Sequence, residues 1–292
     1  MEAIYLACTQ EEADIKMFLH AVDATSRGAT QIRIFSPDTD VLVLAVRRYP
    51  QLCTDTAFVT GRGIKERVIP LEKVYNALGE KKAAALPGFH AFTGADNTGA
   101  FSGKTKKSAF AAFDAADEDV LNAFVNLGTT PEVTQLIIDG LIKFTCNMYA
   151  PSKKSSIADI RWWLFHKKGF QSEKLPPTEA ALILSIKRSH YQSYIWSSDM
   201  TAVPQELDAL DYGWKLENNL YVPCTTTLPP APDAVIELVK CGCSKTNCGT
   251  ERCTCKKNSL RCTELCGCSD NDDECLNIHV SEEEDENTEF LL

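Results

Sequence analysis

Nine cysteines near the C-terminal end of the chain are the residues best suited to chemistry. Between one and six residues separate them, in the order Cys241, Cys243, Cys248, Cys253, Cys255, Cys262, Cys266, Cys268 and Cys275. Thiolates this closely spaced are typical of structural zinc sites, where sulfur surrounds the ion tetrahedrally. Nine separate thiolates serve two four-coordinate ions with one left over, whereas three ions need twelve bonds, so that three thiolates must bridge. We therefore expect Zn²⁺ here, with three ions as the preferred count.

A disulfide-bonded knot is the alternative for these cysteines. Residues 1–14 contain no basic stretch followed by an apolar one, so we expect no secretory signal and no oxidising compartment. The total of 13 cysteines is also odd. Few apolar residues accompany the cysteines, chiefly Leu260, Leu265 and Leu276. Metal ligation must then supply most of the folding free energy of this segment, on the order of 10 kcal/mol per ion.

Acidic residues in the first third of the chain form a second candidate centre. Glu12 and Asp14 begin a predicted helix, Asp38 and Asp40 directly follow a predicted strand, and Asp96 lies in a glycine-containing loop. Ligands of open α/β sheets bind beyond the carboxyl ends of the strands. Carboxylates that share a site repel one another unless a cation neutralises them. Hard oxygen ligands suit Mg²⁺ or Mn²⁺, and such ions in pairs activate water for phosphodiester cleavage.

Three of these acids also have an ordinary structural explanation. The two acids of the first helix suit the positive end of its macrodipole, and Asp38 is placed to cap the next helix. These explanations leave Asp40 and Asp96 unaccounted for. His20 and His90 flank the same segments and are interpreted as structural histidines, with a supporting role beside the Asp96 segment as the alternative for His90.

Hydrophobic periodicity predicts the elements that position these residues. We expect helices over 11–27, 71–79, 106–116, 117–126, 131–146, 156–167 and 178–196, and a further helix that Asp38 caps and that runs through 41–46. A strand is predicted over 31–36, and a hairpin from 57–60 and 64–69. Alternation of helices and strands favours an α/β domain with a largely parallel sheet. The aromatic residues of 151–223 are interpreted as core, with a surface for stacking nucleic-acid bases as the alternative.

Composition divides the chain further. We expect an α/β domain over 1–150, a helical extension over 151–223, a linker over 224–240, an irregular cysteine module over 241–277 and a disordered acidic tail over 278–292. A short helix or strand is expected at 233–240, leading into the module. Of the 40 acidic residues, ten lie from Asp270 onward, so the remaining 30 balance the 30 basic residues. Because the acidity belongs to the tail, the net charge of −10 does not exclude a nucleic-acid partner. No apolar run is long enough to predict a membrane span.

The cysteine spacing resembles the CXC domain of the tesmin/TSO1 type, and also the nine-cysteine, three-zinc clusters that precede some SET domains. The resemblance covers 35 residues and implies DNA binding. The basic candidates for DNA contact are Lys245, Arg252, Lys256, Lys257 and Arg261. Because three Zn²⁺ and nine thiolates together carry a net negative charge, electrostatic attraction alone is weak. A scaffold role, in which the module or the acidic tail binds protein partners, stays open beside DNA binding.

Three acidic motifs resemble the internal region of the flap-endonuclease/XPG family, which has a three-layer PIN-like fold. The family's E-A-E helix, S-x-D-x-D segment and S-G-x-D segment correspond in order to Glu12-Ala13-Asp14, Ser36-Pro37-Asp38-Thr39-Asp40 and Thr93-Gly94-Ala95-Asp96. The resemblance covers residues 10–115 and implies a metal-dependent nuclease. A glycine-rich helical turn that grips the duplex backbone follows in the family. Residues 99–107 occupy that position, and the candidates for phosphate contact are Lys104, Lys106 and Lys107.

One part of the family pattern has no counterpart here. The family begins with a strand and loop that supply two further metal-binding aspartates, whereas this chain begins at the E-A-E helix. We expect a fragment, a degenerate copy, or a domain in which another segment replaces the strand. The combination with a CXC module is also similar to sequences derived from mobile elements.

Together these patterns favour a nuclear, DNA-associated protein. Its first domain is interpreted as a Mg²⁺- or Mn²⁺-dependent phosphodiesterase of flap-endonuclease type, intact or degenerate. The alternative is a non-catalytic DNA- or chromatin-binding protein that acts through the zinc module. A third reading is a zinc scaffold for protein partners.

Overall fold

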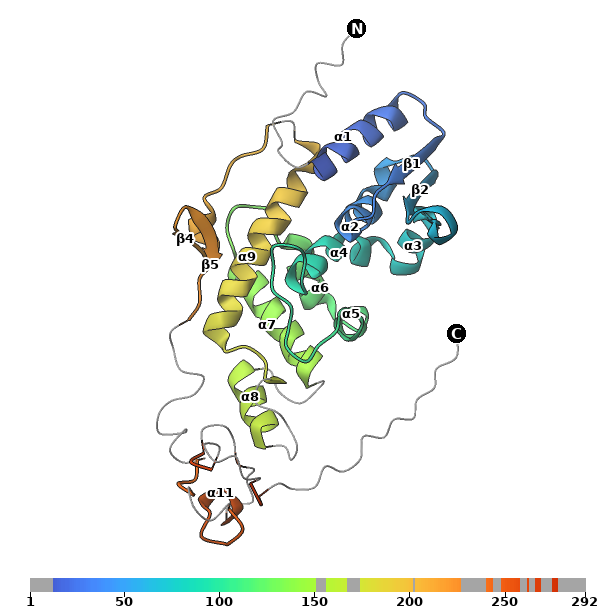
Figure 1. Cartoon of the computed structure of the whole chain (residues 1–292). Helices are drawn as coiled ribbons and strands as arrows, with labels where there is room; N and C mark the ends of the chain where they lie inside the picture. Colours follow the sequence, from blue (N-terminus) through green and yellow to red (C-terminus); the bar gives the residue numbers. More distant parts are fainter. Residues whose placement is uncertain are drawn as a thin grey trace.

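The computed structural model of the chain describes residues 13–150, 156–166, 174–201, 203–226, 240–243, 248–257, 262, 266–268 and 275–277. The expected element at 233–240 lies outside the described residues except for Lys240, and so does the whole acidic tail. Nine helices longer than one turn are described, coloured from blue to yellow in Figure 1. They are α1 (Ala13–Ser26), α2 (Thr39–Arg48), α3 (Leu71–Leu78), α4 (Glu80–Phe92), α5 (Lys106–Asp114), α6 (Glu118–Asn126), α7 (Gln135–Tyr149), α8 (Ile157–His166) and α9 (Glu179–Ser197).

A three-stranded sheet lies beside α1 and α2 (Figure 1). Its strands are β1 (Gln31–Phe35), β2 (Asp55–Thr60) and β3 (Arg67–Pro70), in that spatial order. β1 runs parallel to β2, and β2 runs antiparallel to β3. The predicted strand and hairpin are therefore confirmed. The sheet is less parallel than expected, because a tight connection joins β2 to β3 and such connections join antiparallel strands.

One long buried helix was not predicted. α4 contains Pro87 and Gly88, which are both read as helix breakers in a sequence. It is also apolar on most sides, so it lacks the one-sided periodicity by which a surface helix is recognised. Gly88 is needed for packing, since a Cβ there would meet the Phe124 carbonyl oxygen at 2.4 Å.

Two hydrophobic clusters meet at α4. The first joins the sheet to the helices around it and includes the fully buried Phe18, Leu44 and Leu71. The second lies among α4 to α9 and is rich in aromatic rings, with Phe89 contacting several other phenylalanines. α4 supplies Ala91 to the first cluster and Phe89 to the second. The helices of 156–201 therefore share their core with those of the first 150 residues.

A second, two-stranded sheet follows α9 and was also not predicted. β4 (Trp214–Glu217) and β5 (Leu220–Pro223) are antiparallel. Asn218 and Asn219 join them with positive φ angles of 52° and 63°. Two successive residues with positive φ angles are typical of a type I′ turn, and asparagine adopts a positive φ more readily than most residues do.

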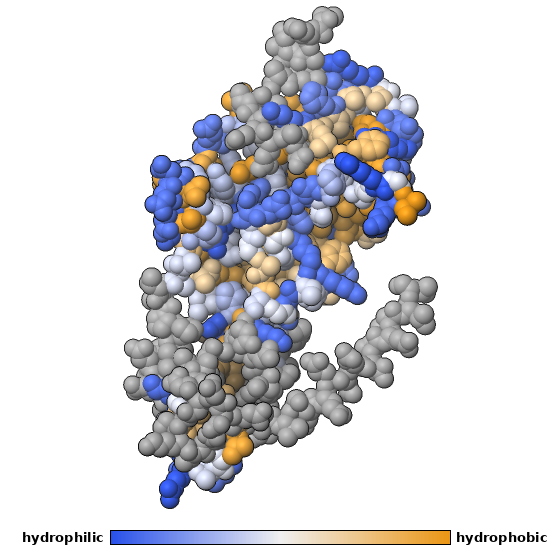
Figure 2. All heavy atoms as spheres, viewed as in Figure 1, coloured by the Kyte–Doolittle hydropathy of each residue, from blue (hydrophilic) through white to orange (hydrophobic). Residues whose placement is uncertain are grey.

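The outer edge of β1 has no strand partner among the described residues. Phe35 at the end of this strand is 69% exposed. Figure 2 shows hydrophobic residues on the surface over α1 and β1, surrounded by hydrophilic ones. None of the helices in the described ranges has the length and apolarity that crossing a bilayer requires.

Candidate metal centres

The turn from β1 into α2 positions two of the predicted acids. The Ser36 hydroxyl accepts a hydrogen bond from the Asp38 backbone N–H at 3.0 Å, and Asp38 Oδ1 accepts one from the Asp40 N–H at 2.9 Å. Asp38 is therefore the N-cap of α2, as its ordinary structural explanation predicts. Its carboxylate and that of Asp40 nevertheless lie close to each other and to the carboxylate of Asp96.

The loop after α4 brings the third acid. Gly94 has a φ of 109°, which turns the chain back on itself. The Thr98 hydroxyl donates to the Ala91 carbonyl at 2.5 Å and accepts from the Ala95 N–H at 2.8 Å, and so ties the loop to α4. Carboxylate oxygens of Asp38, Asp40 and Asp96 lie within 4.8 Å of one another. The structure thus brings together three of the five predicted acids, which come from segments more than fifty residues apart.

Two further side chains surround this carboxylate cluster. His90 Nε2 lies 2.6 Å from Asp40 Oδ1, and the imidazole of this largely buried histidine stacks on Trp196. Lys106 Nζ donates to the carbonyls of His90 and Gly94 at 2.9 and 2.8 Å. Burial lowers the pKa of Lys106 to about 8, although the nearby Asp40 acts in the opposite direction. The supporting role considered for His90 is consistent with this contact to Asp40.

The three carboxylates could hold a metal ion. Neighbouring oxygens around one Mg²⁺ are about 3.0 Å apart, since each bond is about 2.1 Å long. Oxygens that lie within 4.8 Å of one another would therefore have to draw closer to bind one such ion. Asp96 is exposed whereas Asp38 and Asp40 are half-buried, so one side of the cluster faces solvent. Glu12 and the side chain of Asp14 lie outside the described residues.

The basic residues after Asp96 take different positions. Lys106 is turned inward to the two carbonyls. Lys104 Nζ lies 4.8 Å from the centre of the Tyr149 ring, and burial lowers its pKa. Lys107 is exposed. Of the three predicted phosphate contacts, Lys107 is the one fully presented to solvent.

The cysteine module gathers its thiols into three overlapping sets. The sets are Cys241, Cys248, Cys253 and Cys262; Cys241, Cys262, Cys266 and Cys268; and Cys248, Cys262, Cys268 and Cys275. Within each set the sulfur atoms lie within 4.8 Å of one another. Cys262 belongs to all three sets. The remaining two predicted ligands lie nearby, because Cys255 Sγ is 3.6 Å from Cys266 Sγ and Cys243 packs against the buried cysteines.

The sulfur spacings fit tetrahedral metal ligation. Cys241 Sγ is 3.6 Å from Cys248 Sγ and 3.8 Å from Cys262 Sγ, and Cys253 Sγ is 3.9 Å from Cys262 Sγ. A zinc–sulfur bond of about 2.3 Å gives a tetrahedral edge of about 3.8 Å. All nine cysteines of the module are free thiols in the structure. These clustered cysteines can hold a metal such as zinc.

Crowded thiols of this kind resist ionisation until a cation joins them. Burial raises the pKa of Cys248 and of Cys262, and it raises that of Cys268 to about 12. Cys253 differs, because hydrogen bonds from the Lys256 N–H and neighbouring thiols outweigh burial and lower its pKa to about 7. Since the thiolate is the metal ligand, a bound cation favours the charged form that burial disfavours.

Three of the basic candidates in the module are described. Arg252 and Lys257 are exposed, and Lys256 donates from Nζ to the Gly249 carbonyl at 2.8 Å. Lys256 and Lys257 lie in the single-turn helix α11 (Thr254–Lys257). Lys245 and Arg261 lie outside the described residues.

Sequence reasoning missed one charged cluster. Arg47 and Arg48 in the last turn of α2 both contact the fully buried Asp199, which follows α9. About 150 residues separate the partners, and none of them belongs to a recognisable motif. Their association is evident only in the structure, where the last turn of α2 lies beside the end of α9.

Comparison with known proteins adds no assignment. No protein-family model matches the chain. No curated protein and no solved structure shows significant similarity to it. The chain is therefore defined by its own features, as a mixed α/β protein with a cysteine-rich cluster near its C-terminus.

Proposed function

We propose that this chain is a DNA-associated protein that joins a metal-dependent phosphodiesterase domain to a three-zinc module. The convergence of Asp38, Asp40 and Asp96 is the observation that carries the proposal. The resemblance to the flap-endonuclease/XPG family requires these acids to meet, because in that family they bind the metal ions together. Each motif alone is only weak support. A PIN-like fold and nuclear residence belong to the same proposal.

The side chains around the cluster have distinct tasks in this proposal. A bound Mg²⁺ or Mn²⁺ would supply activation of water and stabilisation of the oxygen that leaves the phosphorus. Asp38 and Asp40, at the end of β1, would hold the ion together with Asp96, which is exposed on the side open to a phosphodiester. His90 fixes the orientation of the Asp40 carboxylate through their hydrogen bond, as residues behind a metal ligand commonly do. Lys107 contacts backbone phosphates beyond the cluster.

The zinc module is proposed to hold three ions. Twelve metal–sulfur bonds from nine thiolates require shared ligands, and the three sulfur sets do share members. Arg252 and Lys257 are the exposed cations with which the module contacts duplex DNA, in the manner of the CXC domains it resembles. The expected salt dependence is modest, because few phosphates are neutralised.

Cleavage of a labelled flap substrate by the full-length chain with Mn²⁺ tests the catalytic part. Asp38→Asn keeps an N-cap of similar quality but weakens metal ligation, so the helix survives while cleavage falls at least a hundredfold. Asp40→Ala gives a similar loss. Asp139→Ala, which removes an exposed carboxylate of α7, is the matched control and keeps full activity. Equal inactivity of the wild type and both site variants refutes the enzyme.

The exposed Arg252 and Lys257 support a second candidate, a non-catalytic DNA-binding protein that acts through the module. In that case the Asp38 and Asp40 variants bind DNA as the wild type does, and none of them cleaves. Arg252→Gln/Lys257→Gln then weakens retention of duplex DNA at low salt. If none of these proteins retains DNA, a zinc scaffold for protein partners is the remaining reading.

A further inference from the structure

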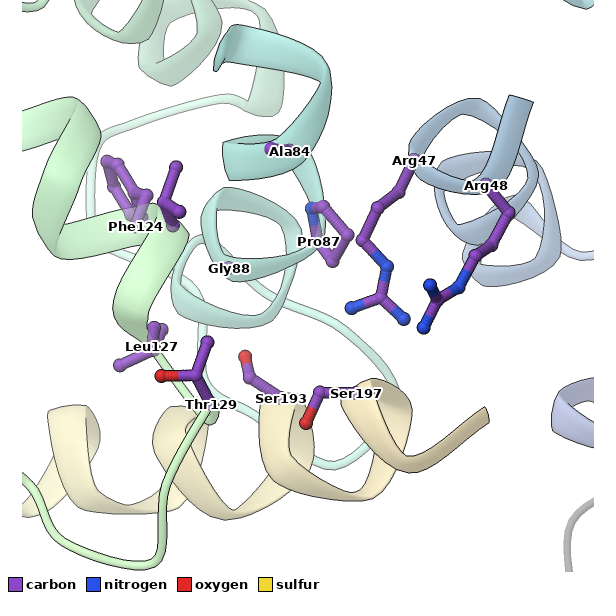
Figure 3. A pocket seen from close by; sticks show the side chains of 11 residues that line it. Arg47, Arg48, Ala84, Pro87, Gly88, Phe124, Leu127, Thr129, Ser193 and Ser197 are labelled. Atoms are coloured by element: carbon purple, nitrogen blue, oxygen red, sulfur yellow. The ribbon is translucent and has the colours of Figure 1, made fainter. Parts of the chain in front are cut away.

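A small pocket lies between α2, α4, α6 and α9, and none of the acids or cysteines described above lines it. Its volume is about 240 Å³. Figure 3 shows the side chains of Arg47 and Arg48 extending from α2 toward Pro87 on α4 and toward Ser193 and Ser197 on α9. The pocket thus combines basic, hydroxyl and apolar side chains from four helices.

The charges beside this pocket do not balance. Arg48 directs its Nε and Nη2 at the two oxygens of Asp199, which is fully buried. Arg47 Nη2 lies 3.0 Å from the same carboxylate and donates to the Trp196 carbonyl at 2.7 Å. One carboxylate therefore serves two guanidinium groups. Burial lowers the pKa of Arg47, Asp199 opposes this, and Arg48 lowers the pKa again. One positive charge remains without a counter-ion among the described residues.

Two hydrogen-bond donors at the same place are also unused. Among the described residues, Arg47 Nε and Ser193 Oγ are buried and have no hydrogen-bond partner. Ser193 is only 2% exposed. Buried donors are nearly always paired, because water no longer solvates them. Ser197 differs, since its hydroxyl already lies 2.5 Å from the Gly128 carbonyl oxygen to which it donates.

We propose that this pocket binds a small organic carboxylate. One carboxylate oxygen accepts from Arg47 and the other from Ser193, once these side chains turn toward the pocket that they line, and a single negative charge matches the single surplus positive charge. Pro87 and Leu127 form an apolar wall for a short hydrocarbon chain. The volume lies just below the range of about 300–1,000 Å³ that is common for ligand sites, so only a few carbon atoms fit. Two guanidinium groups repel any cation.

Two sources carry this chemistry: a free short-chain acid, and the terminal carboxylate of a peptide that ends in a small apolar residue. The proposal does not depend on the proposed function, because its residues are separate from both metal centres. Its failure would leave the nuclease and zinc proposals standing.

Thermal unfolding and calorimetry of the full-length chain test the site with sodium butyrate. Butyrate is expected to raise the Tm, whereas sodium chloride at equal ionic strength and the neutral butyramide are not. Ser193→Ala removes the unpartnered hydroxyl, so the ligand-free protein is at least as stable as the wild type while butyrate affinity falls about tenfold or more. Arg47→Gln abolishes the response. Arg27→Gln, which removes an exposed arginine directly after α1, keeps it.

The outcomes are decisive in either direction. Equal effects of butyrate and butyramide, no effect of butyrate, or full affinity in Ser193→Ala each overturn the proposal. If Arg47→Gln does not fold, Ser193→Ala alone decides. N-acetylvaline, compared with its amide, distinguishes the sources: tighter binding of the acid than of butyrate indicates a peptide terminus, and weaker binding indicates a free acid.

Discussion

The two candidate metal centres of this chain are built in opposite ways. The carboxylate cluster rests on helices and a sheet that bury large apolar side chains such as Phe18 and Leu44 completely. In the described part of the cysteine module, the buried cluster consists of cysteines alone. The first centre is therefore supported by an apolar core, whereas the described residues of the second offer only cysteines for one. If both centres bind metal as proposed, the metal of the first serves chemistry and the metal of the second serves structure.

Chelation of zinc is expected to have the largest effect and to act on one region only. Zinc ligation contributes on the order of 10 kcal/mol per structural ion. The described residues of the module bury no apolar side chains other than cysteines that could replace it. A strong chelator should expose the thiols of the module to a thiol reagent, while the α/β part keeps its Tm. Cys146, which is 1% exposed in the helical core, is the internal control and stays unreactive.

The comparison fails if chelation lowers the Tm of the α/β part as well. It also fails if the thiols of the module stay protected without metal. Either result shows that the module has a source of stability other than its ligands.

Cys262→Ser is expected to remove more zinc than any other single change in the module. Its sulfur belongs to all three sets, whereas Cys243 belongs to none of them. We expect Cys262→Ser to lose at least two ions and Cys243→Ser to lose at most one. Metal analysis of the purified variants, as zinc per chain, measures the difference. Equal losses in the two variants show that Cys262 is not a shared ligand.

Asp199→Ala should destabilise the α/β part without affecting the zinc module. Removing the carboxylate leaves Arg47 and Arg48 facing each other, largely buried and without their common partner. Breaking a buried ion pair in this way costs about 3–5 kcal/mol. Denaturant unfolding of the variant measures the loss, with the exposed Asp139→Ala as control. A drop in zinc content would mean that the two regions are coupled, contrary to their separate construction.

Residues close together in the sequence were the ones whose role could be predicted. The spacing of the nine cysteines predicted that they gather in one cluster, and the motif Ser36-Pro37-Asp38-Thr39-Asp40 placed two acids after a strand, where the structure has them. The meeting of Asp96 with these two was predicted from resemblance, since no local pattern encodes contact over such separations. The partner of Asp40, His90, was named only as an alternative.

Features that depend on packing alone could not be predicted. α4 was missed because Pro87 and Gly88 argue against a helix locally, whereas close packing against α6 makes Gly88 suitable. The partnership of Arg47 and Arg48 with Asp199 was missed because it depends on how the end of α9 meets α2. These misses share one cause: tertiary contacts outweigh local propensity where an element is buried on several sides.

The smallest expected effect is a pH dependence that originates at Lys106, beside the carboxylate cluster. Its pKa is about 8 in the folded chain, against an ordinary value of 10.5. Between these values the unfolded chain binds a proton that the folded chain has released, so the free energy of unfolding from this group rises with pH. Below pH 8 both states are protonated, and burial of the charge is a constant penalty. A neutral amine still has two N–H groups for the carbonyls of His90 and Gly94.

Lys106→Met tests this effect. The variant loses both hydrogen bonds, so its stability is shifted at every pH, but it has no titrating group at this position. Denaturant unfolding from pH 7 to 10.5 should therefore show the wild type gaining stability relative to Lys106→Met as the pH rises above 8. Lys107→Met, which changes the exposed neighbour, should follow the wild type. If the free energies of unfolding of wild type and Lys106→Met instead change in parallel with pH, the Lys106 ammonium is solvated despite its position. The carboxylate cluster is then more accessible to water than the packing of α4 and α5 indicates.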